Sequence, residues 1–197
     1  MDRPMQYSDD TVTELSFLNL VADEAAPRLL GWHLVSRVDD LLTEIALTEV
    51  EAYRSDDPAS HSYGGPRGRN VIMFERPGLL YVYRSYGIHW CANVVCGGVG
   101  VGSAVLLRSG RPVLGEETME RRRGRATSLT AGPGNLCQAL GINGSHNGLD
   151  LLDPTSPIRL IPGPAPAKIE TTRRIGITKA VETPWRFVAT KDGLNGD

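Results

Sequence analysis

The chain contains 197 residues, of which 41% are hydrophobic, and its formal net charge at pH 7 is −2. This length fits one domain, and the hydrophobic fraction is high enough to build a core, which excludes a disordered chain. The sequence shows no apolar run long enough to cross a bilayer and no secretory leader, so we expect a cytoplasmic protein that does not contact membranes.

The cysteines and the charged residues bear on two further kinds of site. Three cysteines without a CxxC or HxxxH pattern predict neither disulfides nor a bound metal, but small buried side chains. We expect no other cofactor. Arginines gather between Arg108 and Arg125, where they could contact phosphates. Such a cluster is equally typical of a solvated helix, and charge alone favours that interpretation.

The first third of the chain predicts a helical unit and a strand. Thr13 to Val35 has the apolar spacing of an amphipathic helix, with a break or a new helix N-terminus at Pro27 and an end at Gly31. Leu42 to Tyr53 predicts a strand that ends in a polar turn at residues 55–58.

The rest of the chain predicts a β-hairpin and then shorter elements. Residues 78–83 and 89–95 have the β-branched and aromatic composition of strands, and the turn Arg84-Ser85-Tyr86-Gly87 joins them. The other expected elements are a flexible connection at 64–68, a glycine-rich bend at 97–102, a strand at 104–107, a helix at 115–125, a break at 132–134, a helix at 136–140, and short strands in a proline-rich last quarter. The order predicts one α+β domain over residues 1–197, with its core at about 13–190 and a largely antiparallel sheet.

The run TEVEAYRSDDPASHS (48–62) carries the first candidate site residues. On a strand, Glu49, Glu51 and Tyr53 lie on the same face, and His61 follows a short turn. A carboxylate beside a ring and an imidazole is typical of a hydrolase that activates water. A polar edge strand followed by a solvated loop would contain the same residues, and this stretch alone does not separate the two interpretations.

The predicted hairpin carries the second group of candidates. Tyr86 lies at its tip, where an exposed ring could insert into the base stack of DNA or could instead fold back onto the sheet. On the returning strand, the amide of Asn93 can both donate and accept, which suits the edge of a nucleic-acid base. An Asn on a strand also often pairs with backbone.

The motifs together resemble a known family. TEVEAY, DPASHS, RNVIMF, PGLLYVYRSYG, HWCANVV, AVLLR, GPGNLCQALGI and RRIGITKAVETPWRF occur in the order found in the alkyladenine (3-methyladenine) DNA glycosylases. The match runs from about Leu15 to Val188, and the chain resembles a compact bacterial-type member. The resemblance implies an α+β fold like that of the FMT C-terminal domain, with a curved antiparallel sheet, flanking helices and a protruding hairpin.

The resemblance also implies an activity and a set of site residues. The enzyme would be a monofunctional, nucleoid-associated monomer that flips alkylated or deaminated purines out of double-stranded DNA. It would hydrolyse the N-glycosidic bond, release the free base and leave an abasic site without a lyase step. The implied residues are Glu51 as general base, Arg108 to position that carboxylate and a phosphate, Tyr53, His61, Tyr83 and Asn93 in the base pocket, Tyr86 as intercalating wedge, and Arg84 on the DNA.

Three departures from the family pattern bear on binding: Arg84-Ser85 after YVY, Pro66-Arg67-Gly68 beside His61, and Asn135 where a lysine is usual. Glu49 could support Glu51 or perturb it by like-charge repulsion. We expect a preference for cationic lesions, since no residue is an obvious acid for a neutral purine. A non-catalytic module for distorted nucleic acid and a hydrolase of free nucleosides are the alternative hypotheses.

Overall fold

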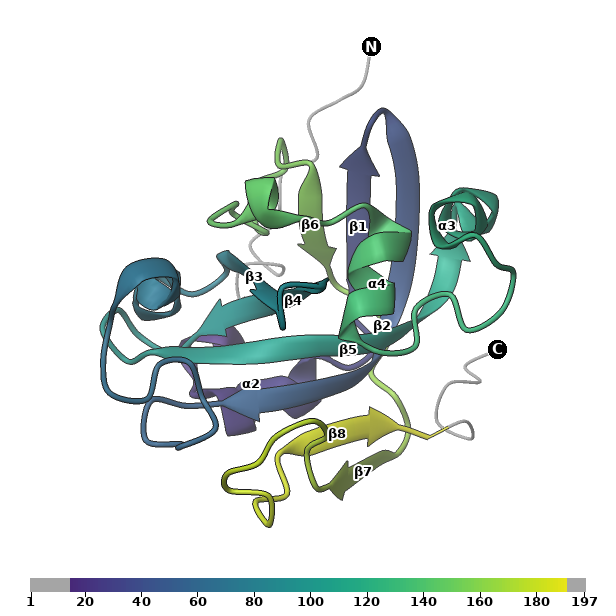
Figure 1. Ribbon diagram of the computed structural model, residues 1–197. Helices are drawn as coiled ribbons and strands as arrows, with labels where there is room; N and C mark the ends of the chain where they lie inside the picture. Colours follow the sequence, from purple (N-terminus) through teal and green to yellow (C-terminus); the bar gives the residue numbers. More distant parts are fainter. Residues whose placement is uncertain (1–14, 191–197) are drawn as a thin grey trace.

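The computed structural model describes residues 15–190, which form a curled antiparallel sheet with short helices packed on it (Figure 1). The helices are η1 (Leu15–Asn19), α2 (Ala22–Leu29), η2 (Gly68–Phe74), α3 (Glu116–Arg123), α4 (Pro133–Leu140) and η3 (Gly144–His146). The strands are β1 (His33–Val38), β2 (Leu41–Tyr53), β3 (Leu80–Ser85), β4 (His89–Cys96), β5 (Ser103–Leu114), β6 (Ile158–Ile161), β7 (Ile169–Thr172) and β8 (Arg186–Ala189).

The strands form one sheet in the order β3-β4-β5-β2-β1-β6, and β8 joins β2 and β7 off this path. Every pairing between these strands is antiparallel. The two longest strands, β2 and β5, pair along most of their length at the centre of the sheet (Figure 1). The structure therefore confirms the predicted α+β fold with an antiparallel sheet and a protruding hairpin.

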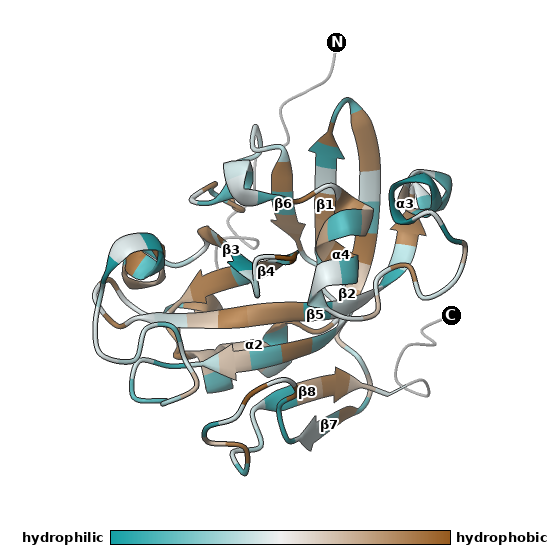
Figure 2. Cartoon of the chain, viewed as in Figure 1, coloured by the Kyte–Doolittle hydropathy of each residue, from teal (hydrophilic) through white to brown (hydrophobic). Residues whose placement is uncertain are grey.

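One face of the sheet carries the main core. The buried apolar residues of α2 and α4 pack against alternate residues of β2, β3, β4 and β5. Figure 2 shows apolar colour concentrated on the central strands, whereas α3 is mainly hydrophilic. A smaller cluster on the opposite face joins Met73, Tyr81, Val95 and Ala104 near η2. Successive side chains of a strand point to opposite faces of the sheet, so each one belongs either to the main core or to the face with the smaller cluster.

A β-bulge in β2 changes which residues face the core. Before it, the odd-numbered Ile45 and Leu47 are in the core; after it, the even-numbered Val50 and Ala52 are. The register against β5 shifts between Leu47 and Glu49 and again between Glu49 and Val50. Because side chains alternate with period two, one extra residue reverses the faces of everything that follows. The bulge thus turns the odd-numbered carboxylates away from the core.

The predicted helix over Thr13 to Val35 is wrong in its extent. Positions 13 and 14 lie outside the described residues, and the remainder divides into η1, α2 and the first residues of β1. Pro27 lies inside α2 and does not break it, because the missing N–H costs one hydrogen bond while the neighbouring Ala25 and Ala26 are fully buried. Gly31 ends the unit as predicted: its φ of +86° is in the left-handed region.

Three further boundaries differ from the sequence predictions. Strand β1 was not predicted; it pairs with β2 through a tight turn in which Asp39 and Asp40 both have positive φ. Strand β5 extends to Leu114 rather than Leu107, because β2 continues beside it. Helix α4 begins at Pro133 instead of after a break, since proline suits the first helical turn.

The remaining elements agree with the sequence predictions. The β3–β4 hairpin, α3 and the short strands of the last quarter are present. β4 begins at His89 as predicted, and the other ends of the hairpin strands and of α3 differ from the prediction by one or two residues. The three cysteines are free and buried. Within residues 15–190, none of the helices has the length and apolar character needed to cross a membrane.

Candidate active site

A cavity of about 470 Å³ lies along the β3–β4 hairpin, on the face of the sheet opposite the main core. One row of side chains crosses four adjacent strands beside it: Tyr81 on β3 pairs with Asn93 on β4, Asn93 with Leu106 on β5, and Leu106 with Glu51 on β2. Residues 59–73 and 175–177 contribute the other walls. The site therefore depends on strand register rather than on any one loop.

Glu51 is fully buried and lies one contact behind the cavity wall. Its Oε1 accepts a hydrogen bond from the backbone N–H of Ile175 at 2.8 Å. Its Oε2 accepts one from the Tyr53 hydroxyl at 2.9 Å and lies 3.3 Å from Nη1 of Arg108. Tyr53, Arg108 and Ile175 all line the cavity. Glu51 thus accepts two hydrogen bonds and forms one ion pair, which leaves part of the four-lone-pair accepting capacity of its carboxylate unused.

Glu49 belongs to an ion-pair network beside Glu51. Its Oε1 accepts from Nε of Arg108 at 2.8 Å and from Nε of Arg186 at 2.7 Å. Burial acts to raise the pKa of Glu49, but the hydrogen bonds and positive charges of Arg186 and Arg108 outweigh it, and the pKa is lowered. Glu49 thus holds Arg108, which in turn contacts Glu51. This supports the hypothesis that Glu49 supports Glu51 rather than perturbs it by like-charge repulsion.

Replacing Glu49 with Gln should lower the free energy of unfolding by about 2 kcal/mol at pH 7, because both arginines lose a charged acceptor. A carboxylate with a depressed folded-state pKa stabilises the fold above its unfolded-state pKa, and this contribution is lost as the pH falls through the folded-state pKa. The difference between wild type and variant should therefore shrink as the pH drops below 4.5, the ordinary value for Glu. Urea unfolding at pH 7 and pH 3 measures the difference in unfolding free energy between wild type and Glu49→Gln. A difference that is the same at both pH values would contradict the ion-pair role.

Aromatic side chains form the wall opposite Glu51. His61 contacts Tyr83 edge to face with ring centroids 4.4 Å apart, and its Nδ1 lies 3.0 Å from the Tyr81 hydroxyl. Arg69 lies over the Tyr83 ring at 5.6 Å. Burial and the positive charge of Arg69 lower the pKa of His61, so the imidazole is neutral at pH 7. The structure thus places the predicted His61 and Tyr83 in the same wall.

Asn93 lines the cavity, and only 4% of its surface is exposed. Its side-chain amide donates to the backbone carbonyl of Tyr81 at 3.0 Å. Asn93 therefore makes the backbone hydrogen bond that was considered as an alternative from sequence, and it also lines the cavity. Cys91, two positions before Asn93 on β4, also lines the cavity, and burial raises the pKa of its thiol.

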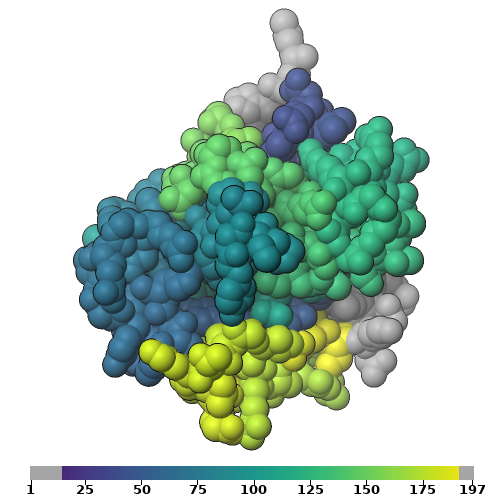
Figure 3. Space-filling model, in the orientation of Figure 1, coloured from purple at the N-terminus to yellow at the C-terminus, as the bar shows by residue number. Residues whose placement is uncertain are grey.

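The tip of the hairpin projects from the molecule. Tyr86 is 88% exposed, so the alternative that its ring folds back onto the sheet is wrong. Its φ of +49° is rare for a bulky residue. Arg84 stacks on Trp90 across the hairpin at 5.7 Å, and both Arg84 and Tyr86 line the cavity mouth. Figure 3 shows the dark teal hairpin on the front face, directly above the yellow C-terminal segment.

Several residues that contact the predicted site were not assigned a role from sequence: Arg69, Tyr81, Asp57, Arg174 and Ile175. The last two belong to the motif RRIGI, which is about 120 residues away from Glu51 along the chain. Position within a shared motif could have drawn attention to Arg174, whereas a backbone N–H such as that of Ile175 leaves no mark in a sequence.

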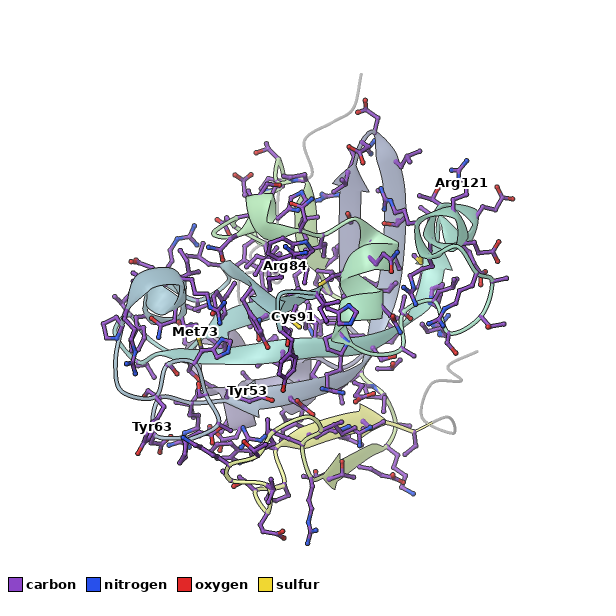
Figure 4. All side chains as sticks on the ribbon, viewed as in Figure 1. Tyr53, Tyr63, Met73, Arg84, Cys91 and Arg121 are labelled. Atoms are coloured by element: carbon purple, nitrogen blue, oxygen red, sulfur yellow. The ribbon has the colours of Figure 1, made fainter. Side chains whose placement is uncertain are left out.

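Of the arginines between Arg108 and Arg125, only Arg108 lines the cavity. In Figure 4, Arg121 is on α3 at the edge of the molecule, whereas Tyr53 and Cys91 lie near its centre. Arg122 donates to backbone carbonyls of Val38 and Ala139, and none of the α3 arginines lines the cavity. Asn135 donates to the carbonyl of Ala131. Within the described part of the chain, no group of three or more His, Cys, Asp or Glu side chains could hold a metal ion.

The arrangement of these groups defines a class of enzyme. A buried carboxylate stands behind a cavity with several aromatic rings in its walls, and this arrangement suits hydrolysis at a flat ring system. The model of the methylpurine-DNA glycosylase family matches residues 16–193. The chain therefore belongs to the methylpurine-DNA glycosylase family and is a hydrolase that acts on DNA.

Bacterial relatives agree with this assignment. A protein of Rhodopseudomonas palustris strain HaA2 is 54% identical over 177 residues, which make up 88% of this chain and 82% of that protein. One from Granulibacter bethesdensis is 54% identical over 147 residues, or 72% of this chain and 68% of that protein. One from Rubrobacter xylanophilus is 48% identical over 161 residues, or 81% and 84%. All three carry the provisional name 3-methyladenine DNA glycosylase.

Proposed function

We propose that the protein flips an alkylated or deaminated purine out of duplex DNA and hydrolyses its N-glycosidic bond. The observation that carries this proposal is the position of Glu51: fully buried, one contact behind an aromatic cavity whose mouth carries the exposed Tyr86. The relatives named as 3-methyladenine DNA glycosylases support the same substrate class.

The chemistry follows from the groups around Glu51. Its carboxylate takes a proton from a water molecule, whose oxygen bonds to C1′ of the sugar. The N-glycosidic bond breaks and its electron pair leaves with the purine, so the products are the free base and an abasic site. The transition state resembles an oxocarbenium ion, which the carboxylate also stabilises electrostatically. Arg108 holds the carboxylate in place at 3.3 Å.

The cavity walls favour purines that are already cationic. A 3-methyladenine or 7-methylguanine leaves without further protonation, whereas hypoxanthine needs an acid. His61 is the cavity imidazole, and its lowered pKa leaves it neutral at pH 7, so it is a weak candidate for that acid. We therefore propose that cationic lesions are excised faster. Asn93, which lines the cavity, would disfavour the exocyclic amine of guanine, so that a guanine should be excised only when alkylation has already made it a good leaving group.

Among residues 15–190, no lysine lines the cavity, which supports a single hydrolytic step without a Schiff base. The double-stranded DNA would be bound by a monomer, with Tyr86 filling the gap left by the flipped base and Arg84 near the phosphates. Tyr53, His61 and Tyr83 would surround the base in the cavity.

A panel of labelled duplexes with one lesion each tests this function. Under single-turnover conditions we expect 7-methylguanine to be excised faster than hypoxanthine or ethenoadenine, and methylated DNA to release 3-methyladenine. Alkali should be needed to cleave the strand, and borohydride should trap no covalent complex. Hydrolysis of free 7-methylguanosine with duplexes left intact would favour a nucleoside hydrolase, and tight binding without any excision would favour a binding module.

A further inference from the structure

A buried ion pair lies beside the catalytic carboxylate. The Arg174 and Asp57 side chains are 0% and 1% exposed, and the guanidinium binds the carboxylate through both terminal nitrogens. Nη1 of Arg174 also donates to the backbone carbonyl of Ala52 at 3.0 Å. Asp57 in turn accepts from the backbone N–H of Ala59 at 3.0 Å. The pair therefore connects the C-terminal segment to β2 and to the loop that leads to His61.

Arg174 also stacks between two rings. Its guanidinium lies 4.7 Å from the centroid of Tyr53 and 5.3 Å from that of Trp185, and Arg54 lies over Trp185 at 5.5 Å. Cation–π contacts are strongest where the cation is desolvated, as Arg174 is. Tyr53 is thus held from one side of its ring by a charge whose own position is set by Asp57 and Ala52.

Both hydrogen bonds that Glu51 accepts depend directly on this arrangement. The Tyr53 hydroxyl, which binds Oε2, belongs to the ring that Arg174 covers. The Ile175 N–H, which binds Oε1, belongs to the residue that follows Arg174. Arg174 itself makes no hydrogen bond to Glu51 and does not line the cavity. An effect of Arg174 on catalysis would therefore act through Tyr53 and Ile175.

We propose that Asp57 and Arg174 are positioning residues that set the two hydrogen bonds by which Tyr53 and Ile175 aim the Glu51 carboxylate. This inference rests on the proposed role of Glu51 as general base. Stability alone is a weak reason for such a pair, because buried ion pairs can often be replaced by apolar residues of similar volume without loss of stability. The pair, by contrast, makes contacts that apolar residues cannot reproduce: the bidentate contact, the bond to Ala52 and the charge above Tyr53.

The test compares a double variant with a matched control. Asp57→Leu/Arg174→Met replaces the two charged side chains by apolar ones, and Arg173→Met/Glu182→Leu makes a comparable change in the adjacent exposed pair. The measurements are the melting temperature, the Kd for a duplex with a tetrahydrofuran abasic analogue, and the single-turnover rate of 7-methylguanine excision at saturating enzyme. That rate constant does not depend on the fraction of folded protein, so a purely structural role would not change it.

We expect Asp57→Leu/Arg174→Met to slow excision about 10- to 100-fold, as misplacement of a catalytic group does, with Kd changed less than about twofold. The control should excise at the wild-type rate. Wild-type excision by a folded double variant would overturn the proposal. If the double variant does not fold, Arg174→Lys decides: it keeps the charge but not the planar, multiply bonded guanidinium, and a wild-type rate would again overturn it.

Failure of this inference is distinguishable from failure of the proposed function. If wild-type protein excises no lesion, or if Glu51→Gln excises at full rate, the function or the role of Glu51 is wrong. If wild type is active, Glu51→Gln is inactive and the Asp57/Arg174 variants match wild type, only the positioning role is wrong.

Discussion

A Glu51→Gln protein is expected to bind a damaged duplex as the wild type does but to excise the base about 10²- to 10⁴-fold more slowly, the range that general base catalysis contributes. Gln has nearly the same shape and can still accept from the Ile175 N–H, so the buried site should keep its packing. It cannot take a proton from water or offset the positive charge of the transition state. The loss should therefore appear in the excision rate and not in the affinity for DNA.

Single-turnover excision of 7-methylguanine and the Kd for a tetrahydrofuran duplex measure the two quantities separately. Glu44→Gln is a suitable control because Glu44 lies on the same strand, β2, and pairs with His33 away from the cavity. The control should excise at the wild-type rate. Full activity of Glu51→Gln would remove Glu51 from the role of general base and leave the buried network a structural one.

Replacing Tyr86 with Ala should slow excision from fully paired duplexes about 10- to 100-fold, because stacking of a base on an aromatic ring contributes about 1–3 kcal/mol. The ring is 88% exposed, so its removal should leave the melting temperature unchanged. The effect should shrink when the lesion is mispaired or in single-stranded DNA, since less pairing energy must then be replaced. This dependence on pairing distinguishes a wedge from a simple surface contact.

The measurement is the excision rate on paired, mispaired and single-stranded substrates, compared between Tyr86→Ala and Tyr63→Ala. Tyr63 is a matched control: it is 48% exposed, does not line the cavity, and lies at the periphery in Figure 4. An equal loss on all three substrates would show that Tyr86 contributes affinity but no insertion. An equal loss in both variants would point to a general effect of surface tyrosines.

Much of the site could be predicted because its residues stand in local patterns. The alternation in β2 correctly placed Glu49, Glu51 and Tyr53 on one face, as their shared contacts with Arg108 and with each other confirm. The hairpin was predictable from its turn and its aromatic strands. The turn alone did not decide whether Tyr86 folds back onto the sheet, and the structure shows the ring exposed. Roles in catalysis for these residues stay predictions until the variants are measured.

Other features depend on residues that are distant in the chain. The end of the first helical unit was correctly predicted at Gly31. Strand β1 was missed because it forms through pairing with β2, which its own composition does not indicate. The length of β5 likewise depends on β2. Asp57 and Arg174 are separated by 117 positions, and nothing local indicates that two charged side chains in polar surroundings will be fully buried together.

The sequence by itself determined the family, the α+β fold class and the residue types of the pocket, because the alternation of a strand and the composition of a turn are local properties. Only the tertiary structure decided which way Glu51 faces. Ile45 and Leu47 share its odd numbering and lie in the core, so an uninterrupted strand would have turned Glu51 into the core as well. The bulge between Leu47 and Val50 reverses that alternation, and a bulge is set by pairing with β5, not by β2 alone.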